Sequence, residues 1–188
     1  MINFSIVFIH GYTASSLSDW YPAIAKELKK LHVDFAIPDL PGRQSPKASQ
    51  WLRVLHSVIN NTKKPLIIVG HSLGTRAALL YLEKYKKRVE KVFLIAAFAN
   101  AVENTQRHNG EAYPDFFTHR IDMKKIKQLG GKFIVIHSKD DSSIPFSQGV
   151  SIAKDLSAEL ITYNGKDHFS APEDAVIILD VLRRELRI

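Results

Sequence analysis

The strongest constraint on the fold of this chain is the regular alternation of short apolar runs with stretches of helical periodicity. Six apolar runs predict β-strands, at residues 3–9, 33–38, 65–70, 91–97, 132–138 and 158–163. Apolar residues at helical spacing predict helices at residues 18–31, 49–60, 73–86, 146–156 and 172–186. The strand runs are continuously apolar rather than alternating, which is typical of strands that are buried on both faces.

This order of elements predicts the α/β class, with a doubly wound, mostly parallel six-stranded sheet and helices on both faces. We expect the strands in the spatial order 2-1-3-4-5-6. The 188 residues are enough for one sizeable core, so residues 1–188 are expected to form a single domain. In such sheets, ligands bind beyond the carboxyl ends of the strands where the order reverses, here between the first and third strands.

Composition excludes several kinds of site and partner. The chain has no cysteine, which excludes disulfides, thiolate metal sites and a cysteine nucleophile. Its net charge is +7, but the basic residues mix with apolar residues at helical spacing and so predict solvated helix faces and no nucleic-acid partner. No segment approaches the ~18 apolar residues of a membrane span, and the N-terminal run is interpreted as a buried strand rather than a signal peptide. We expect a cytoplasmic protein with no membrane partner and no cofactor.

The predicted third strand leads into the pentapeptide GHSLG, in which Ser72 lies between Gly70 and Gly74. Either Ser72 is a nucleophile on a sharp bend, or the glycines only close a tight connection. The motif alone is weak, because chance supplies a match in a chain of this length roughly one time in twenty. Its position between a strand and a helix favours the nucleophile, since glycines would remove side chains that collide across the bend.

A serine nucleophile needs a histidine base and an acid that orients this base. Asp140 and Asp141 follow the predicted fifth strand, and His168 follows the sixth. Each has an ordinary alternative, since aspartates are common in turns and loop histidines are common at surfaces. All three residue types occur after the expected strands, in the order Ser, Asp, His that a nucleophile elbow requires. Spacing alone does not choose between the two aspartates.

The oxyanion of an acyl-transfer reaction needs two amide donors. One is expected from Leu73, directly after the candidate nucleophile. The other is expected from Tyr12 in the loop after the first strand, where Gly11 lets the backbone approach. The alternative interpretation of Gly11 is a turn that ends the strand.

Residues 98–122 form the only long stretch without clear periodicity. The stretch contains Phe98, Tyr113, Phe116 and Phe117, which are candidate walls of a narrow acyl pocket under a minimal lid. The equally weighted alternative is a satellite hydrophobic cluster beneath a loop.

A rival interpretation is a metal-dependent hydrolase, because His10, His71, His137 and His168 all fall near predicted strand ends. No His-x-His or His-Glu-x-x-His pair supplies adjacent ligands, so we expect no metal site. Strand alternation is expected to turn His71 away from the pocket.

The segments FIHGYTAS, DLPG, VGHSLG, DDSSIP and DHF occur in the order found in the α/β-hydrolase fold family, across nearly the whole chain. The chain most resembles the small YdeN-like and retinoblastoma-binding-protein-like serine hydrolases. This resemblance implies that Ser72 is the nucleophile and His168 the general base. It also selects Asp141 as the acid, four residues before Pro145, and leaves Asp140 as a turn residue.

Two further comparisons with the family concern the type of reaction and the subfamily. Family members that are dehalogenases or epoxide hydrolases carry an aspartate at the elbow, where this chain has Ser72. Gln44 departs from the frequent glycine of the family's D-x-P-G-x-G-x-S loop, which affects subfamily placement and not the chemistry.

The function expected from the sequence is hydrolysis of a small-molecule carboxylic ester through an acyl-enzyme. The alternatives are a thioesterase or peptidase with the same triad, and a protein-binding module with secondary hydrolase activity. Fold and triad do not name a substrate, an oligomeric state or a protein partner.

Overall fold

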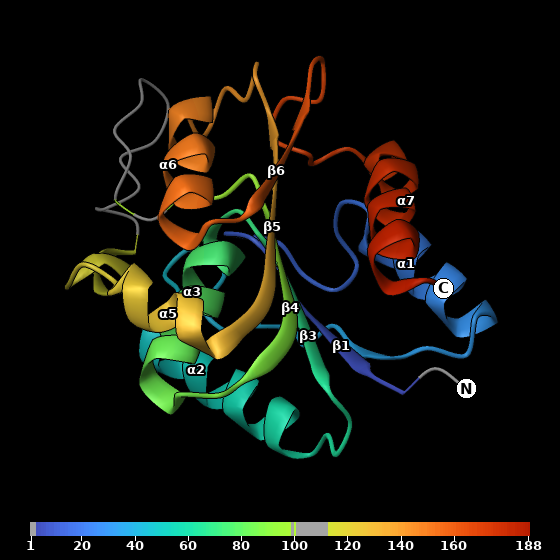
Figure 1. The fold of residues 1–188 in the computed structure, drawn as a ribbon, viewed down its shortest axis with the longest axis horizontal. Helices are drawn as coiled ribbons and strands as arrows, with labels where there is room; N and C mark the ends of the chain where they lie inside the picture. Colours follow the sequence, from blue (N-terminus) through green and yellow to red (C-terminus); the bar gives the residue numbers. More distant parts are fainter. Residues whose placement is uncertain (1–2, 99, 101–112) are drawn as a thin grey trace.

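The computed structural model describes residues 3–98, 100 and 113–188 of the chain. Its strands are β1 (Ser5–Ile9), β2 (Asp34–Ala36), β3 (Leu66–His71), β4 (Val89–Ile95), β5 (Gly130–Ser138) and β6 (Glu159–Tyr163). They form a six-stranded sheet in the order β2-β1-β3-β4-β5-β6, and every neighbouring pair is parallel (Figure 1). The predicted fold class and strand order are therefore confirmed.

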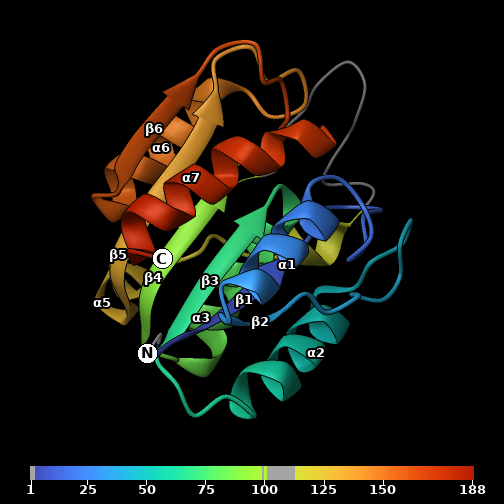
Figure 2. The same ribbon diagram turned by 90° about the vertical axis from the view of Figure 1, so that its right-hand side faces the viewer.

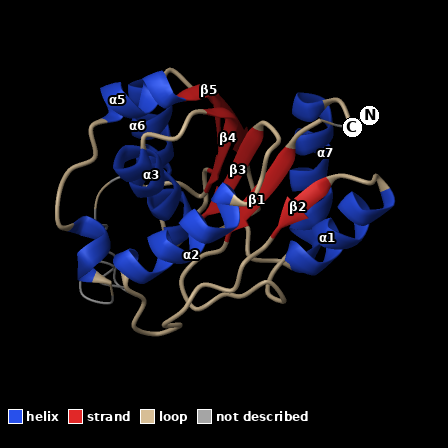
Figure 3. Ribbon diagram, turned by 90° about the horizontal axis from the view of Figure 1, so that it is seen from below, coloured by secondary structure: helices blue, strands red, loops and turns tan. Residues whose placement is uncertain are grey.

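Helices cover both faces of this sheet, as the sequence predicted (Figures 1 and 3). One face carries α1 (Tyr21–Lys30) and α7 (Ala175–Leu186). The other face carries α2 (Ala48–Asn60), α3 (Leu73–Tyr85), α5 (Met123–Leu129) and α6 (Phe146–Leu156). Two short 3-10 helices, η1 (Pro114–Phe117) and η2 (Pro172–Asp174), complete the described elements. The first of them lies in the stretch for which the sequence shows no periodicity.

Burial on both faces explains the continuous apolar runs. In β3, Leu66 and Ile68 pack into the core on the α2–α3 side, whereas Ile67 and Val69 pack into the core on the α1–α7 side. Each side chain is at most 3% exposed. Full burial of such an aliphatic side chain stabilises the fold by about 1.5–3 kcal/mol, so polar residues are disfavoured at every position of the strand.

The reversal of strand order positions the loops after β1 and β3 next to each other. In the parallel register Ile9 pairs with Gly70, so Gly11 and Ser72 follow at the same level, two residues beyond that pair. From β1 the chain crosses to β2 on one side and then returns to β3 on the other (Figure 2). The loops that leave β1 and β3 therefore border one site at the carboxyl edge of the sheet.

No helix in the described part of the chain is long and apolar enough to cross a membrane.

Candidate active site

Ser72 occupies a sharp bend between the end of β3 and the first residue of α3. Its backbone has φ 52° and ψ −122°, a conformation that is strained for a residue with a side chain. The surrounding main chain holds it there: the Ser72 amide donates to the Ile95 carbonyl at 2.9 Å, and the Ser72 carbonyl accepts from the Thr75 amide at 2.9 Å and hydroxyl at 2.7 Å. The strain is thus stabilised by hydrogen bonds to two neighbouring elements.

The two glycines of the pentapeptide allow a close approach of backbones across this bend. A Cβ atom on Gly74 would lie 2.0 Å from the Ile9 carbonyl oxygen of β1, and one on Gly70 would lie 2.8 Å from the Gly74 carbonyl oxygen. Both distances are shorter than atoms tolerate. The glycines therefore permit α3 to pack directly against β1 and β3.

His168 connects Ser72 to Asp141. The Ser72 Oγ lies 2.8 Å from His168 Nε2, and His168 Nδ1 lies 3.0 and 3.1 Å from the two carboxylate oxygens of Asp141. The three residues are 7%, 8% and 9% exposed in the order Ser72, His168, Asp141. With the Nδ1–H donated to the carboxylate, Nε2 is the free acceptor for the serine proton. The geometry is that of a nucleophile, a base and an orienting acid.

Several donors surround the Asp141 carboxylate. Its Oδ1 accepts from the amides of Ser143 at 2.9 Å and Ile144 at 2.8 Å, and its Oδ2 lies 3.3 Å from His137 Nε2. Burial alone would raise the pKa of Asp141. Hydrogen bonds from His137, His168 and Ile144 outweigh burial and hold this pKa well below its usual range, so the carboxylate is ionised.

Asp140 has a different set of partners. It accepts hydrogen bonds from the Ser138 hydroxyl and, at 2.9 and 3.4 Å, from the amides of Gly165 and Asp167. These bonds tie the loop after β5 to the loop that carries His168. Asp140 therefore braces the loops while Asp141 contacts the imidazole, a distinction that the spacing in the sequence leaves open.

Two amides stand near Ser72 as candidate oxyanion donors. Leu73 is the first residue of α3, so its N–H has no acceptor within the helix. The loop after β1 passes close to the serine: a Cβ atom on Gly11 would lie 3.2 Å from Ser72 Cβ. The amide of Tyr12, the next residue, is therefore near Ser72. His10 supports this loop, since its Nδ1–H donates to the Gly11 carbonyl at 2.9 Å and its Nε2 accepts from the Leu40 amide at 2.9 Å.

A hollow of about 260 Å³ opens beside Ser72 and His168. Its lining is mainly polar and includes Thr13, Ser18, Asp19, His71 and Ser170. His71 therefore lines the pocket, and the expectation that strand alternation turns it away is wrong. His71 keeps the alternation of β3, which places it with Ile67 and Val69 on the α1–α7 side, where its ring lies 5.8 Å from that of Trp20. The hollow extends over this side of the sheet, where Ser18 and Asp19 line it.

The four aromatic residues expected at the pocket wall lie elsewhere. Phe98, Tyr113 and Phe116 are at most 3% exposed in the core on the α2–α3 side, and Phe117 packs against this core with its ring 5.8 Å from that of Phe98. None of the four is among the described residues that line the hollow beside Ser72. Tyr113 comes nearest, through a ring contact at 5.0 Å with Tyr12. They belong to the main core on the α2–α3 side, so they form neither a wall of this hollow nor a separate satellite cluster. Residues 99 and 101–112 of the expected lid lie outside the described residues.

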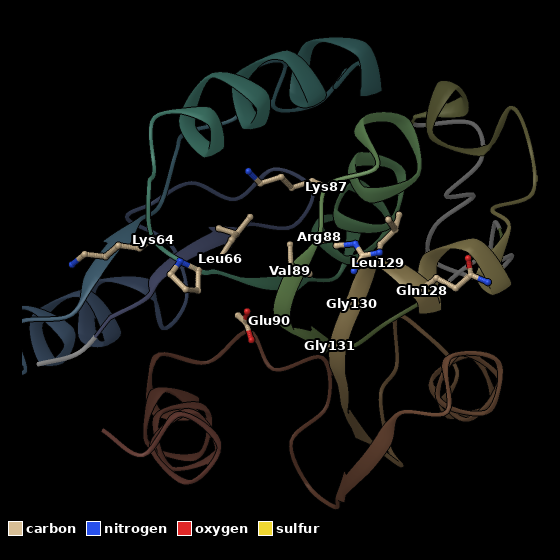
Figure 4. Close-up of a pocket in the computed structure, with 11 residues that line it drawn as sticks. Lys64, Leu66, Lys87, Arg88, Val89, Glu90, Gln128, Leu129, Gly130 and Gly131 are labelled. Atoms are coloured by element: carbon tan, nitrogen blue, oxygen red, sulfur yellow. The ribbon is translucent and has the colours of Figure 1, made fainter.

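A second hollow, of about 320 Å³, lies at the opposite, amino-terminal edge of the sheet (Figure 4). Lys64, Lys87, Arg88 and Glu90 line it, together with the first residues of β3, β4 and β5. No hydroxyl or imidazole group is among its described lining residues, so this hollow offers no nucleophile and no histidine base.

Three of the histidines considered as metal ligands, His10, His71 and His137, each place one ring nitrogen within hydrogen-bond distance of a main-chain carbonyl oxygen. His71 Nε2 donates to the His168 carbonyl at 2.8 Å, and His10 Nδ1 donates to the Gly11 carbonyl. The His137 Nε2–H is shared between the Ile144 carbonyl at 3.0 Å and Asp141 Oδ2 at 3.3 Å. Within residues 3–98, 100 and 113–188, no group of three or more His, Asp or Glu side chains is arranged to hold a metal ion.

The fold and the site together define a hydrolase of the α/β class with a serine at the nucleophile elbow. The sequence model of the serine hydrolase family matches residues 6–175, and the chain belongs to this family. YdeN of Bacillus subtilis is 30% identical over 182 residues, which cover 94% of this chain and 93% of YdeN. The crystal structure of the ydeN gene product superimposes with a TM-score of 0.86 at 28% identity and covers 98% of this chain and 99% of that one.

One further relative and one protein of the same fold extend the comparison. The serine hydrolase RBBP9 of Rattus norvegicus is 26% identical over 156 residues, which cover 82% of this chain and 80% of RBBP9. A thermophilic esterase from Thermogutta terrifontis shares the fold, with a TM-score of 0.75 at 14% identity over 98% of this chain and 89% of that one. The family resemblance expected from the sequence motifs is therefore confirmed.

Two residues of the site were not singled out for these roles by the sequence. His137 precedes Asp141 by four residues at the end of β5 and was considered only as a metal ligand, because its contact with Asp141 depends on the turn between them. Asp19 carries no motif, and it reaches the hollow because the chain turns at it with φ 51° just before α1. A polar residue directly before the buried Trp20 is the only sequence signal for it.

Proposed function

We propose that this chain hydrolyses small carboxylic esters through an acyl-enzyme formed on Ser72. The observation that carries the proposal is the continuous chain of contacts from Ser72 Oγ to His168 Nε2 at 2.8 Å and from His168 Nδ1 to Asp141 at 3.0 Å. A serine hydroxyl is a weak nucleophile without such a base, and the base needs an acid that fixes its tautomer. Membership of the serine hydrolase family supports the same chemistry.

In the proposed acylation step, Ser72 Oγ attacks the ester carbonyl while His168 Nε2 takes the hydroxyl proton. The amides of Leu73 and Tyr12 donate to the oxyanion of the tetrahedral intermediate. The intermediate then collapses, the bond to the alcohol breaks, and His168 returns the proton to the leaving oxygen. Asp141 stabilises the imidazolium throughout, because its carboxylate stays ionised.

In the proposed deacylation step, His168 removes a proton from a water molecule that attacks the acyl carbonyl. Collapse of the second tetrahedral intermediate breaks the bond to Ser72 Oγ, and the serine recovers its proton from His168. The carboxylic acid then leaves. The hollow of about 260 Å³ beside Ser72 supports a small substrate, since drug-sized ligands occupy pockets of about 300–1,000 Å³.

The experiment that tests this function combines a fluorophosphonate probe with a panel of p-nitrophenyl esters and acyl thioesters. We expect the wild-type chain to be labelled and to hydrolyse short-chain esters, and Ser72→Ala to lose both properties while it stays folded by circular dichroism. Absence of labelling in a folded wild-type chain would contradict the proposal and favour a binding module. Faster turnover of thioesters than of esters would assign the same site to thioester hydrolysis.

A further inference from the structure

Two side chains that line the hollow beside Ser72 face each other without a hydrogen bond. His71 Nδ1 lies 3.9 Å from the Asp19 Oδ2, and no described residue donates to or accepts from this nitrogen, although it is completely buried. The His71 side chain is 3% exposed and the Asp19 side chain 20%. A buried polar atom without a partner is costly, which makes this pair the least satisfied feature of the pocket.

Both groups are hydrogen-bond acceptors. His71 Nε2 lies 2.8 Å from the His168 carbonyl oxygen, so the ring proton resides on Nε2. Burial and the neighbouring His168 lower the pKa of His71 to about 3, so the ring is neutral and its Nδ1 carries a lone pair. The Asp19 carboxylate also only accepts when it is ionised. Two acceptor atoms, His71 Nδ1 and Asp19 Oδ2, therefore lie 3.9 Å apart, and neither can donate a hydrogen bond to the other.

The charges around this space favour a cation. Asp19 is the only charged residue among the described residues that line the hollow. The hydroxyls of Ser18, Thr13 and Ser170 surround the same space and add further polar partners. A group with two or more N–H donors and a positive charge would satisfy the carboxylate and the imidazole nitrogen together.

We propose that Asp19 and His71 form a subsite for a primary ammonium group, so that the preferred substrates are small esters that carry a protonated amine close to the reacting carbonyl. This proposal rests on the proposed function, because the subsite borders the same hollow as Ser72. The ammonium donates one N–H to Asp19 Oδ2 and one to His71 Nδ1. Anionic esters are disfavoured, because the lining has no described cation to bind them.

The test uses isosteric pairs of esters in which an ammonium replaces a methyl group. One pair is the 2-naphthyl ester of alanine against that of isobutyric acid, which places the amine on the acyl side. The other is the acetate of 4-(aminomethyl)phenol against that of 4-ethylphenol, which places it on the leaving-group side. We expect the wild-type chain to prefer at least one ammonium ester by about tenfold or more in kcat/KM.

The test variant is Asp19→Asn, which removes one negative charge inside the hollow. Its matched control is Asp180→Asn, which removes one negative charge from the exposed surface of α7. Asp19→Asn should abolish the preference, measured as the ratio of kcat/KM within each pair, and Asp180→Asn should retain it. Equal rates for both members of each pair, or a preference that survives Asp19→Asn, would overturn the subsite and leave water as the bridge between the two acceptors.

A binding measurement separates the failure of the subsite from the failure of the proposed function. Benzylammonium binding to Ser72→Ala, followed by NMR titration, does not depend on hydrolysis. If the double variant Ser72→Ala/Asp19→Asn binds benzylammonium about tenfold more weakly than Ser72→Ala does, the result supports the subsite even if no ester is hydrolysed. Binding that is unchanged by Asp19→Asn overturns it.

Discussion

His137 Nε2 lies 3.3 Å from Oδ2 of Asp141, the same carboxylate oxygen that lies 3.0 Å from His168 Nδ1. Both the His137 and the Asp141 side chains are fully buried. Two imidazoles therefore meet at one carboxylate oxygen, while the other oxygen accepts from two backbone amides. This arrangement fixes the plane of the carboxylate and hence the orientation of the ring that it holds.

The first prediction concerns His137 as a positioning residue. His137→Met removes the donor to Asp141 and should lower kcat about tenfold with little change in KM, because one charge-assisted hydrogen bond is lost. The pKa of Asp141 should rise towards its ordinary value. His137→Gln keeps an N–H at a similar position and should retain most of the activity. Equal losses of kcat in the two variants would show that His137 only fills space.

The second prediction separates the two adjacent aspartates. Asp141→Asn should lower kcat by about three to four orders of magnitude, because an amide no longer holds the imidazole tautomer or stabilises its charge. Asp140→Asn should cost less than about tenfold in kcat and should mainly lower the free energy of unfolding, since Asp140 bonds the loops after β5 and β6. Steady-state kinetics and urea denaturation of both variants measure the two effects. The reverse pattern would make Asp140 the acid.

The third prediction concerns the close packing at Gly74. Gly74→Ala would place a Cβ 2.0 Å from the Ile9 carbonyl oxygen, so we expect at least about 2 kcal/mol of lost unfolding free energy together with reduced fluorophosphonate labelling. Gly165→Ala is the control, because no atom lies within 4 Å of its added Cβ and only its positive φ of 69° opposes the change. It should cost about 1–2 kcal/mol and leave labelling intact. A Gly74→Ala variant as stable and reactive as wild type would contradict the packing.

The fourth prediction is a pH dependence of stability that arises from His71. Its pKa falls from 6.5 to about 3 on folding, mainly because burial disfavours the charged ring. Between these two values the unfolded chain binds the extra proton, so the free energy of unfolding should fall as the pH is lowered, by up to about 1.4 kcal/mol per pH unit. His71→Gln keeps a donor for the His168 carbonyl and removes the titration. Urea denaturation across this window should therefore show a shallower slope for the variant than for wild type.

Much of the fold could be predicted from the sequence because burial on both faces leaves a direct trace in each strand. The runs around Ile68, Phe93 and Val135 are apolar at every position, and the helices between them show periodic apolar residues. The strand order followed from general rules of crossover handedness. The element η1 could not be predicted, since four residues are too few to show a helical period.

The candidate site was predictable where local chain geometry dictates residue type. Gly70 and Gly74 are required by the bend at Ser72, and this requirement is visible in five consecutive residues. The aromatic residues of the stretch after β4 show the limit of such reasoning, because a run of aromatic side chains is equally consistent with a pocket wall and with a core.

The sequence by itself determined the α/β architecture, the elbow at Ser72 and the order in which an acid and a histidine follow it, because these depend on periodicity and chain order. Spacing in the sequence left Asp140 and Asp141 open as the acid, and the family resemblance implied Asp141. Only the tertiary structure showed the contact of Asp141 with His168, the contact of His137 with this same carboxylate, and the approach of Asp19 to His71 beside the serine. These relationships join residues that lie on different loops. Their distances depend on how the β1, β3, β5 and β6 loops converge at one edge of the sheet, which no local pattern in the chain records.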